Sequence, residues 1–245
     1  MQRRISLAVI ALGLVALASG AFADQQPAGR GRAAGAAGQA EGRGARAGGP
    51  PAAPVLLFKE VWKKPYEGEP TEANRDIIRR VTPAAVVTQK LELKLYGADA
   101  KNVLVTEHED REDLWNGMTT SPVAVTVRDR TSYFDLSGRA RLRWIVRTNA
   151  LHQVHPVLKL ADGRLIIGDG QETGGEFVQR EVAFNTSKWY LLDPQKVVTT
   201  TEVTNADLTK VDEIGFADLS PGGGHNSAGW INVSHVELYA KAVPR

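Results

Sequence analysis

Hydrophobic and polar residues alternate with a period of two along much of the chain beyond residue 85. In the run 141–147, Leu142, Trp144 and Val146 alternate with arginines, and the runs 90–95 and 123–128 repeat the pattern. A β-strand sends successive side chains to opposite faces, so the alternation predicts strands with one buried face. Further strands are expected at residues 155–160, 164–169, 176–184, 188–193, 196–203, 212–219 and 230–240.

Turn-forming residues separate these runs. Ala161-Asp162-Gly163 predicts a tight hairpin between two of them, because Asp-Gly favours the turn types that join antiparallel strands. Helical signals are weak: residues 71–81 predict a short helix or a turn, and residues 206–211 a single turn capped by Asn205. Many short strands with little helix predict an all-β fold, an antiparallel β-sandwich of the jelly-roll type. Trp144 is expected in its core.

The stretch SPGGGHNSAGW, residues 220–230, lies between two expected strands. A phosphate-binding loop of the Walker type would need Lys after the glycines and then a helix, whereas His225 and Asn226 follow here and a strand begins at Trp230. Glycine accepts positive φ, so we expect a wide bend. Loops often carry binding residues, which makes His225, Asn226 and Trp230 candidates for contact with a ligand, together with Trp115.

The N-terminus has the features of an export signal. Arg3 and Arg4 precede an apolar run at residues 5–19, and Ala21-Phe22-Ala23 is a small-x-small cleavage site. We therefore expect a signal peptide over residues 1–23, secretion or a periplasmic location, and no membrane span in the mature chain; a retained anchor is the alternative. Residues 24–54 are rich in Gly, Ala, Arg and Pro, which predicts a disordered linker before a single domain over residues 55–245.

Charge and cysteine content narrow the function classes. The signal and linker hold six of the 30 basic residues and two of the 28 acidic ones, which leaves 24 basic and 26 acidic residues in 55–245. A nearly neutral domain gives no reason to expect a nucleic-acid partner. The chain has no cysteine, which excludes disulfides, zinc–thiolate sites and thiol nucleophiles.

Three groups of polar residues are candidates for chemistry. The acidic stretch 107–117 suits calcium or a pair of catalytic carboxylates, and a solvated loop is the favoured alternative. His152 and His155 are three apart on an expected strand, so they point to opposite faces and do not form a joint metal site. His235, in the last strand, is expected to pack or to make an internal hydrogen bond.

An arginine stripe is expected on one face of one strand and comprises Arg139, Arg141, Arg143 and Arg147. Like charges in a row repel, so we expect acidic partners on neighbouring strands. The alternative is a groove for an anionic polysaccharide, in which Arg141 and Arg143 would contact the ligand. No nucleophile elbow of the G-x-S-x-G kind and no dinucleotide fingerprint is present.

The stretches SYFDLSGRARLRWIVRT (132–148), VLKLADGRLIIGD (157–169), KWYLLDPQKVV (188–198) and NADLTKVDEIGFADLSPGGGHNSAGWINVSHVELYA (205–240) resemble uncharacterised secreted bacterial proteins. More distantly, they resemble galactose-binding-like jelly rolls that serve as carbohydrate-binding modules. The resemblance covers most of residues 58–240 and implies a jelly-roll fold and a carbohydrate ligand. It also implies a structural calcium held by an early Glu and a late Asp. Glu60 fits the early position, and because Ser234 stands at the late one, Glu237 is the candidate substitute.

These observations favour an exported, non-catalytic carbohydrate-binding domain of the bacterial cell envelope. The alternatives are a glycoside hydrolase or lyase on a β-sandwich, using Glu109, Asp110 or Asp113 with His225, and a structural envelope protein without a small ligand. Two carboxylates about 5–10 Å apart in one cleft would favour the enzyme.

Overall fold

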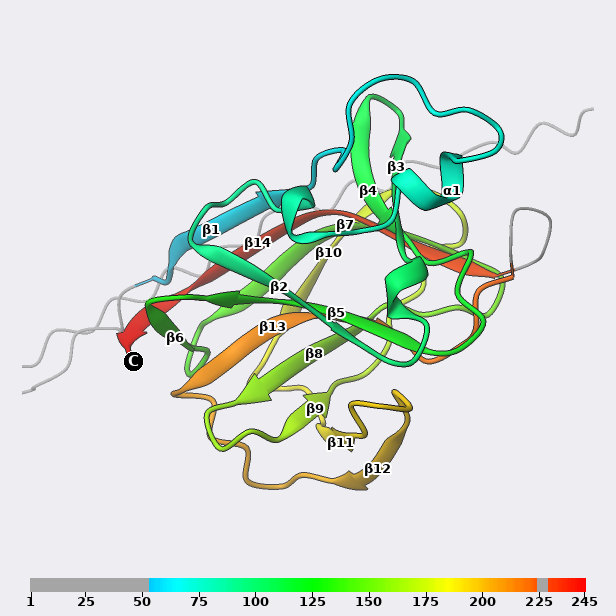
Figure 1. Ribbon diagram of the computed structural model, residues 1–245. Coiled ribbons are helices and arrows are strands. Elements are labelled where there is room, and N and C mark those ends of the chain that lie inside the picture. The colour runs from blue at the N-terminus through cyan, green and yellow to red at the C-terminus, as the bar shows by residue number, and fades with distance from the viewer. Residues whose placement is uncertain (1–52, 224–228) are drawn as a thin grey trace, which may run out of the picture. The chain divides into compact units, whose positions relative to one another are not determined.

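The computed structural model describes residues 53–223 and 229–245, which form an antiparallel β-sandwich (Figure 1). The expected signal peptide, residues 1–23, and nearly all of the expected linker lie outside this part of the chain. The elements are β1 (Val55–Val61), α1 (Arg75–Ile78), β2 (Leu91–Tyr96), β3 (Leu104–His108), β4 (Arg111–Trp115), β5 (Val123–Asp129), β6 (Ser132–Asp135), β7 (Arg141–Asn149), β8 (His155–Leu160), β9 (Leu165–Ile167), β10 (Val178–Ala183), β11 (Tyr190–Leu192), β12 (Thr199–Glu202), β13 (Val211–Asp218) and β14 (Trp230–Pro244). The predicted all-β jelly-roll class is confirmed.

One layer, sheet A, is built around the long strand β14. β7 pairs with one edge of β14, and β10 pairs with β7. The other edge of β14 is shared, because β1 pairs with its residues 235–240 and β4 with residues 232–233. β3 pairs with the outer edge of β4, so the β3–β4 hairpin continues sheet A at the end where β14 begins.

The second layer, sheet B, has the strand order β2-β5-β13-β8-β9-β11-β12, again with antiparallel neighbours. β6 connects the layers, because it pairs with both β13 and the last residues of β14. Along each strand, successive side chains point to opposite faces of the sheet. Side chains of the two inner faces therefore meet in one core between the sheets.

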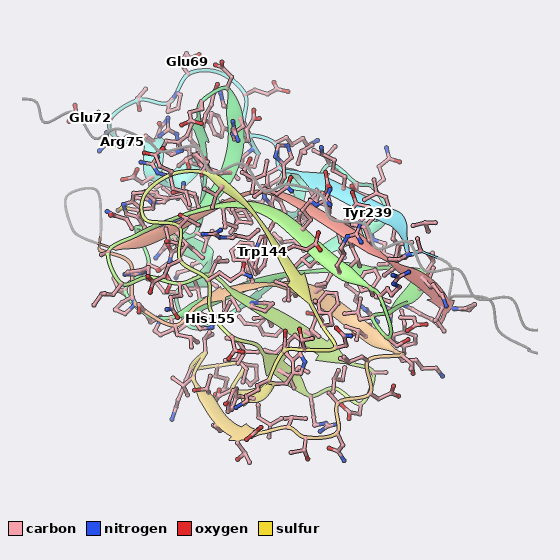
Figure 2. The ribbon with its side chains drawn as sticks, turned by 180° about the vertical axis from the view of Figure 1, so that it is seen from behind. Glu69, Glu72, Arg75, Trp144, His155 and Tyr239 are labelled. Atoms are coloured by element: carbon pink, nitrogen blue, oxygen red, sulfur yellow. The ribbon has the colours of Figure 1, made fainter. Side chains whose placement is uncertain are left out.

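Trp144 lies in that core, as predicted, and is fully buried together with Leu142 and Val146 (Figure 2). Its indole Nε1 donates a hydrogen bond to the side-chain oxygen Oε1 of Gln171 at 2.9 Å, which satisfies the polar atom of a buried aromatic side chain. Ile214 and Phe216 of β13 face the same core from sheet B. A smaller cluster, which includes Val157, Leu165, Ile167, Leu192 and Val197, covers part of the outer face of sheet B.

Several local predictions can be compared with the structure. The hairpin at Ala161-Asp162-Gly163 is confirmed, with β8 and β9 paired and Gly163 at φ 90°. Residues 71–81, predicted as a short helix or a turn, contain the single helical turn α1. Residues 206–211 form a turn without a helix, in which Asp207 Oδ1, rather than Asn205, accepts a hydrogen bond from the backbone N–H of Thr209.

The acidic stretch 107–117 departs from its favoured interpretation. It was expected as a solvated loop, whereas most of it forms the paired strands β3 and β4. Arg139 is also placed differently, because it is exposed and precedes β7 instead of lying on it. Within residues 53–223 and 229–245, no helix is long and apolar enough to cross a membrane.

Candidate functional site

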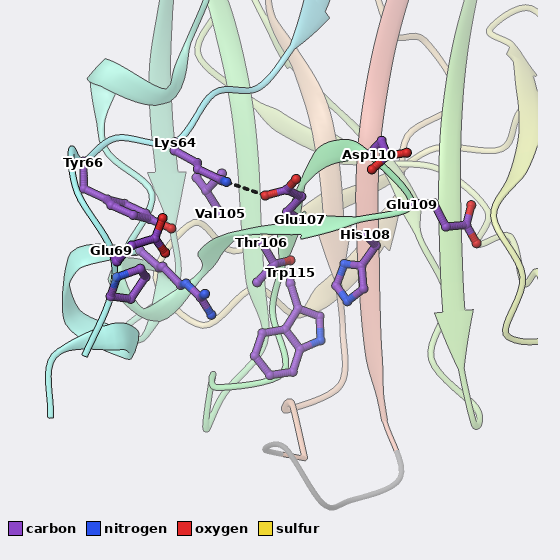
Figure 3. A pocket seen from close by; sticks show the side chains of 12 residues that line it. Lys64, Tyr66, Glu69, Val105, Thr106, Glu107, His108, Glu109, Asp110 and Trp115 are labelled. Carbon is purple, nitrogen blue, oxygen red and sulfur yellow. Dashed lines mark hydrogen bonds and ion pairs between the residues drawn. The ribbon is translucent and has the colours of Figure 1, made fainter. Parts of the chain in front are cut away.

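An open pocket with a volume of about 580 Å³ lies beside the β3–β4 hairpin (Figure 3). β3 and the hairpin turn form one side of it. The segment that follows β1, residues 64–70, and Arg79, which follows α1, form the other. Its lining residues are Lys64, Tyr66, Glu69, Pro70, Arg79, Val105, Thr106, Glu107, His108, Glu109, Asp110 and Trp115. We refer to it below as the hairpin pocket.

The turn of the hairpin lies on the rim of this pocket. Its two central residues, Glu109 and Asp110, have φ values of 51° and 60°. A two-residue turn with positive φ at both positions matches the twist of the flanking strands, but it favours Gly, Asn or Asp. Glu109 therefore adopts a backbone conformation that costs about 1 kcal/mol, and the pairing of His108 with Arg111 holds it there.

Asp113 fixes the hairpin from behind the pocket. Its side chain is fully buried, and Oδ1 accepts hydrogen bonds from Thr106 Oγ1 and Asn232 Nδ2, both at 2.6 Å. Oδ2 lies 2.8 Å from His108 Nδ1. One carboxylate thus connects β3, β4 and β14. It also orients the imidazole of His108, which lines the pocket.

Charged side chains of opposite sign meet at the pocket wall. Lys64 donates a short hydrogen bond to Glu107, and about half of each side chain is exposed to solvent. This bond raises the pKa of Lys64 and lowers that of Glu107, so both stay charged around neutral pH. The pair offers a ligand both a donor and an acceptor at the pocket wall.

Two aromatic side chains border the pocket. Trp115 ends β4, and Figure 3 shows its indole on the strand side, with Tyr66 on the opposite, loop side. Trp115 is 8% exposed, because much of its ring packs on Gly117, where a Cβ atom would approach Trp115 Cζ2 to 2.0 Å. Tyr66 is half-buried and therefore offers more of its ring to a ligand. The site thus combines ring surfaces with planar polar groups.

Of the candidate ligand-binding residues that the structure describes, only Trp115 lines the hairpin pocket. Trp230 begins β14, where the guanidinium of Arg147 lies 4.8 Å from its ring centroid. Arg141 and Arg143 lie on the outer face of sheet A. His225 and Asn226 lie outside the described residues.

The acidic partners expected for the arginine stripe are present for two of its members. Arg141 and Arg143 both contact Glu181 of β10, at 3.3 and 3.4 Å, and Arg143 also lies 3.8 Å from Glu237 of β14. Both guanidinium groups lie over the ring of Tyr239, at 4.6 and 5.2 Å from its centroid. Figure 2 shows Tyr239 on this side of the molecule. Ion pairing therefore occupies the two arginines proposed as ligand contacts.

The two carboxylates proposed for calcium do not form one site. β1 and β14 pair Glu60 with Val236 and Lys59 with Glu237, so Glu60 faces the core while Glu237 faces outward. Glu60 accepts hydrogen bonds from the backbone N–H groups of Val87 at 2.6 Å and Thr88 at 3.0 Å. Burial alone would raise the pKa of Glu237, but hydrogen bonds from Lys59 and Tyr239 outweigh it and lower the pKa. The two carboxylates thus lie on opposite faces of sheet A, and each has its own partners within the protein.

The histidines have separate surroundings. His152 Nδ1 lies 2.5 Å from the buried carboxylate of Asp218, and His155 Nδ1 lies 3.0 Å from the carbonyl oxygen of Gly168. His235 packs in β14 without the internal hydrogen bond considered for it, since its buried Nδ1 has no partner among the described residues. In the same part of the chain, no three His, Asp or Glu side chains are arranged to hold a metal ion.

The carboxylates named for the enzyme alternative differ in their surroundings. Glu109 and Asp110 lie on the hairpin turn at the rim of the pocket. Asp113 is fully buried, and its two oxygen atoms are engaged by Thr106, His108 and Asn232. Asp113 therefore supports the pocket wall and is not exposed to a substrate.

A second groove, of about 540 Å³, lies on the outer face of sheet B, where Tyr96 and Lys159 form part of its floor. Beneath them the buried carboxylate of Glu213 accepts hydrogen bonds from Tyr96 at 2.7 Å, Thr126 at 2.6 Å and Lys159 at 3.0 Å. Burial, followed by the bond to Glu213, raises the pKa of Tyr96. The polar groups of this floor already satisfy one another, which leaves fewer of them for a ligand than in the hairpin pocket.

No protein-family model matches the chain, and no curated protein does. Among solved structures, the chain is similar to the family 11 carbohydrate-binding module of the cellulosomal cellulase Lic26A-Cel5E of Clostridium thermocellum. The identity is 12%, the match covers 62% of this chain and 83% of the module, and the TM-score is 0.38. A second structure of a family 11 module from that organism contains a β-1,3-1,4-mixed-linked tetrasaccharide; here the identity is 12%, the coverage 63% and 86%, and the TM-score 0.37.

The chain is also similar to an exo-β-agarase at 10% identity and a TM-score of 0.37, over 65% of this chain and 24% of the agarase. These likenesses concern the fold alone. Carbohydrate-binding modules, to which the sequence resemblance pointed, are thus among the solved structures similar to this chain.

The sequence did not single out the loop side of the hairpin pocket. Lys64 and Tyr66 follow β1 in a segment without a strand pattern, and Lys64 meets Glu107 across 43 positions of the chain. Such a contact depends on tertiary structure and has no local signal. Tyr66 next to Pro65 and Lys64 is an aromatic loop residue, which is the one feature that could have marked it.

Proposed function

We propose that this chain is an exported, non-catalytic domain that binds carbohydrate in the hairpin pocket. The observation that carries the proposal is the combination of two aromatic rings, Tyr66 and Trp115, with the oriented ion pair Lys64–Glu107 in one open pocket of about 580 Å³. A role at the bacterial cell envelope is part of the proposal. It is supported by the expected signal peptide and by the linker-like composition of residues 24–54.

Sugar rings have two kinds of surface, and the pocket has a counterpart for each. The axial C–H groups of a pyranose form an apolar face that packs on an aromatic ring, and its equatorial hydroxyls donate and accept hydrogen bonds. Tyr66 supplies the ring face, while Glu107 accepts and Lys64 and Arg79 donate. Charge-assisted hydrogen bonds are the stronger kind, and an ion pair that is already formed loses little freedom when a ligand binds.

The pocket wall is rigid where it matters for such binding. Asp113 fixes β3 to β4 and β14, and Gly117 lets Trp115 pack closely against the backbone. A prearranged site binds with a smaller loss of conformational entropy, and an open pocket accommodates a chain of sugar units that extends beyond it. These features favour binding of a polysaccharide without turnover.

The proposal is tested with the mature chain, residues 24–245, incubated with insoluble polysaccharides and with soluble mixed-linked β-glucan. We expect retention on at least one glycan without release of reducing ends. Tyr66→Ala should weaken binding about tenfold, because loss of one stacking contact costs about 1.4 kcal/mol. Tyr133→Ala is the matched control, since Tyr133 packs under Arg245 on β6 and does not line the pocket.

Two results would contradict the proposal. Equal binding by the Tyr66→Ala and Tyr133→Ala variants would remove the hairpin pocket from the binding site. Release of reducing ends by the mature chain would replace a binding domain by the enzyme alternative, and Glu109→Gln and Asp110→Asn would then show which carboxylate of the turn takes part.

A further inference from the structure

Four side chains from different segments form a stack on the outer side of sheet A. The guanidinium groups of Arg111 and Arg147 lie 5.3 and 5.6 Å from the ring centroid of Phe177, and that of Arg147 lies 4.8 Å from the ring of Trp230. β4, β7, β14 and the segment before β10 each contribute one member. We refer to Arg111, Phe177, Arg147 and Trp230 as the arginine–aromatic stack.

Arg147 differs from the other arginines of β7. Arg141 and Arg143 are paired with glutamates, whereas no carboxylate of the described residues lies within ion-pair distance of Arg147. Arg147 Nε donates to the carbonyl oxygen of Gly175 at 2.6 Å, and its ring contacts fix the plane of the guanidinium. Its two terminal nitrogens have no hydrogen-bond partner in residues 53–223 and 229–245. A rigid cation with free donors is thus presented on this face.

The surroundings of the stack are positive. The other cation, Arg111, has Glu109 at 3.5 Å as its one ion-pair partner among the described residues, and the Glu109 side chain is 59% exposed. On the same face, the pKa of His235 is lowered, first by burial and then by the positive charges of Lys59 and Arg111, against a smaller opposing effect of the Glu237 carboxylate. The face therefore favours an anion over a second cation.

The stack borders the hairpin pocket. His108 lines that pocket, and its imidazole lies 6.2 Å from the ring of Phe177. Arg111 is the strand partner of His108 across the hairpin turn. A glycan that occupies the pocket and extends over the turn would reach Arg111 and then Arg147.

We propose that the arginine–aromatic stack binds the carboxylate of an acidic glycan, so that the ligand is a uronic-acid polysaccharide; this rests on the function proposed above. A planar guanidinium donates two parallel hydrogen bonds to a carboxylate, and a stacked one is already oriented to do so. Phe177 and Trp230 stabilise the cation from its faces and leave its N–H edge for the ligand. A neutral glycan has no group that needs such a cation.

The test is affinity electrophoresis of the mature chain in native gels that contain polygalacturonate, highly methyl-esterified pectin, mixed-linked β-glucan or dextran sulfate. We expect retardation by polygalacturonate and a much weaker effect of the esterified pectin, in which the carboxylates are neutralised. Arg147→Gln should weaken binding to polygalacturonate at least tenfold. Arg143→Gln is the matched control, and it should change binding less than twofold because Arg143 is already ion-paired.

A second variant separates charge from orientation. Phe177→Leu keeps both arginines but removes the ring between them, and we expect it to weaken binding several-fold. Circular dichroism shows whether each variant is folded. Because Arg147 and Phe177 are both partly exposed, the two variants should retain the spectrum of the parent chain.

The outcomes distinguish this inference from the function on which it rests. Equal losses in Arg147→Gln and Arg143→Gln would mean that a diffuse positive field, and not the stack, attracts the polymer, which overturns the inference. Binding to dextran sulfate but not to polygalacturonate would overturn the assignment of a carboxylate. Binding to neutral β-glucan that depends on Tyr66 and is unaffected by Arg147→Gln would refute the stack while the hairpin pocket stands.

Discussion

Replacing Asp113 by alanine removes the one acceptor that connects three strands at the hairpin pocket. The carboxylate is fully buried and accepts hydrogen bonds from the side chains of Thr106, Asn232 and His108 at 2.6, 2.6 and 2.8 Å. Each bond contributes about 1–1.5 kcal/mol net, and donors left unsatisfied in a buried site add to the loss. We therefore expect Asp113→Ala to lower the free energy of unfolding by about 3–5 kcal/mol.

Urea denaturation of the mature chain measures this effect. Glu112→Ala is the matched control, because Glu112 is the neighbouring carboxylate of the same strand, is only half-buried and points to the opposite face. We expect the control to change stability by less than about 0.5 kcal/mol. Similar losses for both variants would mean that Asp113 has no special role, and the structural account of the pocket wall would then be wrong.

Three further predictions concern stability. Burial is the main cause of the lowered pKa of His235 in the folded chain, so the unfolded chain binds this proton first as the pH falls. The free energy of unfolding should therefore be constant above about pH 6.5 and decrease below it. In melting temperatures measured over a pH series, His235→Gln should flatten this decrease. Gly97→Ala should lower the melting temperature more than Gly138→Ala. Both glycines have positive φ, but a Cβ atom added at Gly97 would lie 2.5 Å from a backbone oxygen, whereas the space at Gly138 is open. Equal shifts of the melting temperature would contradict this prediction. Glu60→Gln should lower the free energy of unfolding by about 1–3 kcal/mol with or without a chelator, because the backbone N–H group of either Val87 or Thr88 loses its acceptor. A loss that disappears in the presence of a chelator would support the calcium hypothesis.

The sequence predicted the fold where burial was one-sided and periodic. Leu142, Trp144 and Val146 alternate with arginines, and they are the buried face of β7. The β3–β4 hairpin was missed because its charged residues mimic a solvated loop. Asp113 is the decisive case, since an Asp within an acidic run is usually exposed, whereas its burial depends on Asn232, 119 positions away.

The candidate site was predicted only in part, for a similar reason. Trp115 was named and lines the pocket, but Lys64 and Tyr66 come from a distant loop. The arginine stripe was visible as a pattern, yet the pattern treats its members alike. Only the structure separates the paired Arg143 from Arg147, because the glutamates and the aromatic rings that make the difference lie on other strands.

Titration of the ¹⁵N-labelled mature chain with an oligosaccharide that it retains tests the central claim most directly, because the spectrum reports on each cavity separately. We predict that the largest shifts occur at the indole N–H of Trp115 and at the backbone N–H groups of Tyr66 and Glu107, in the hairpin pocket. Shifts concentrated instead at Tyr96 and Lys159, in the groove on sheet B, would contradict the account.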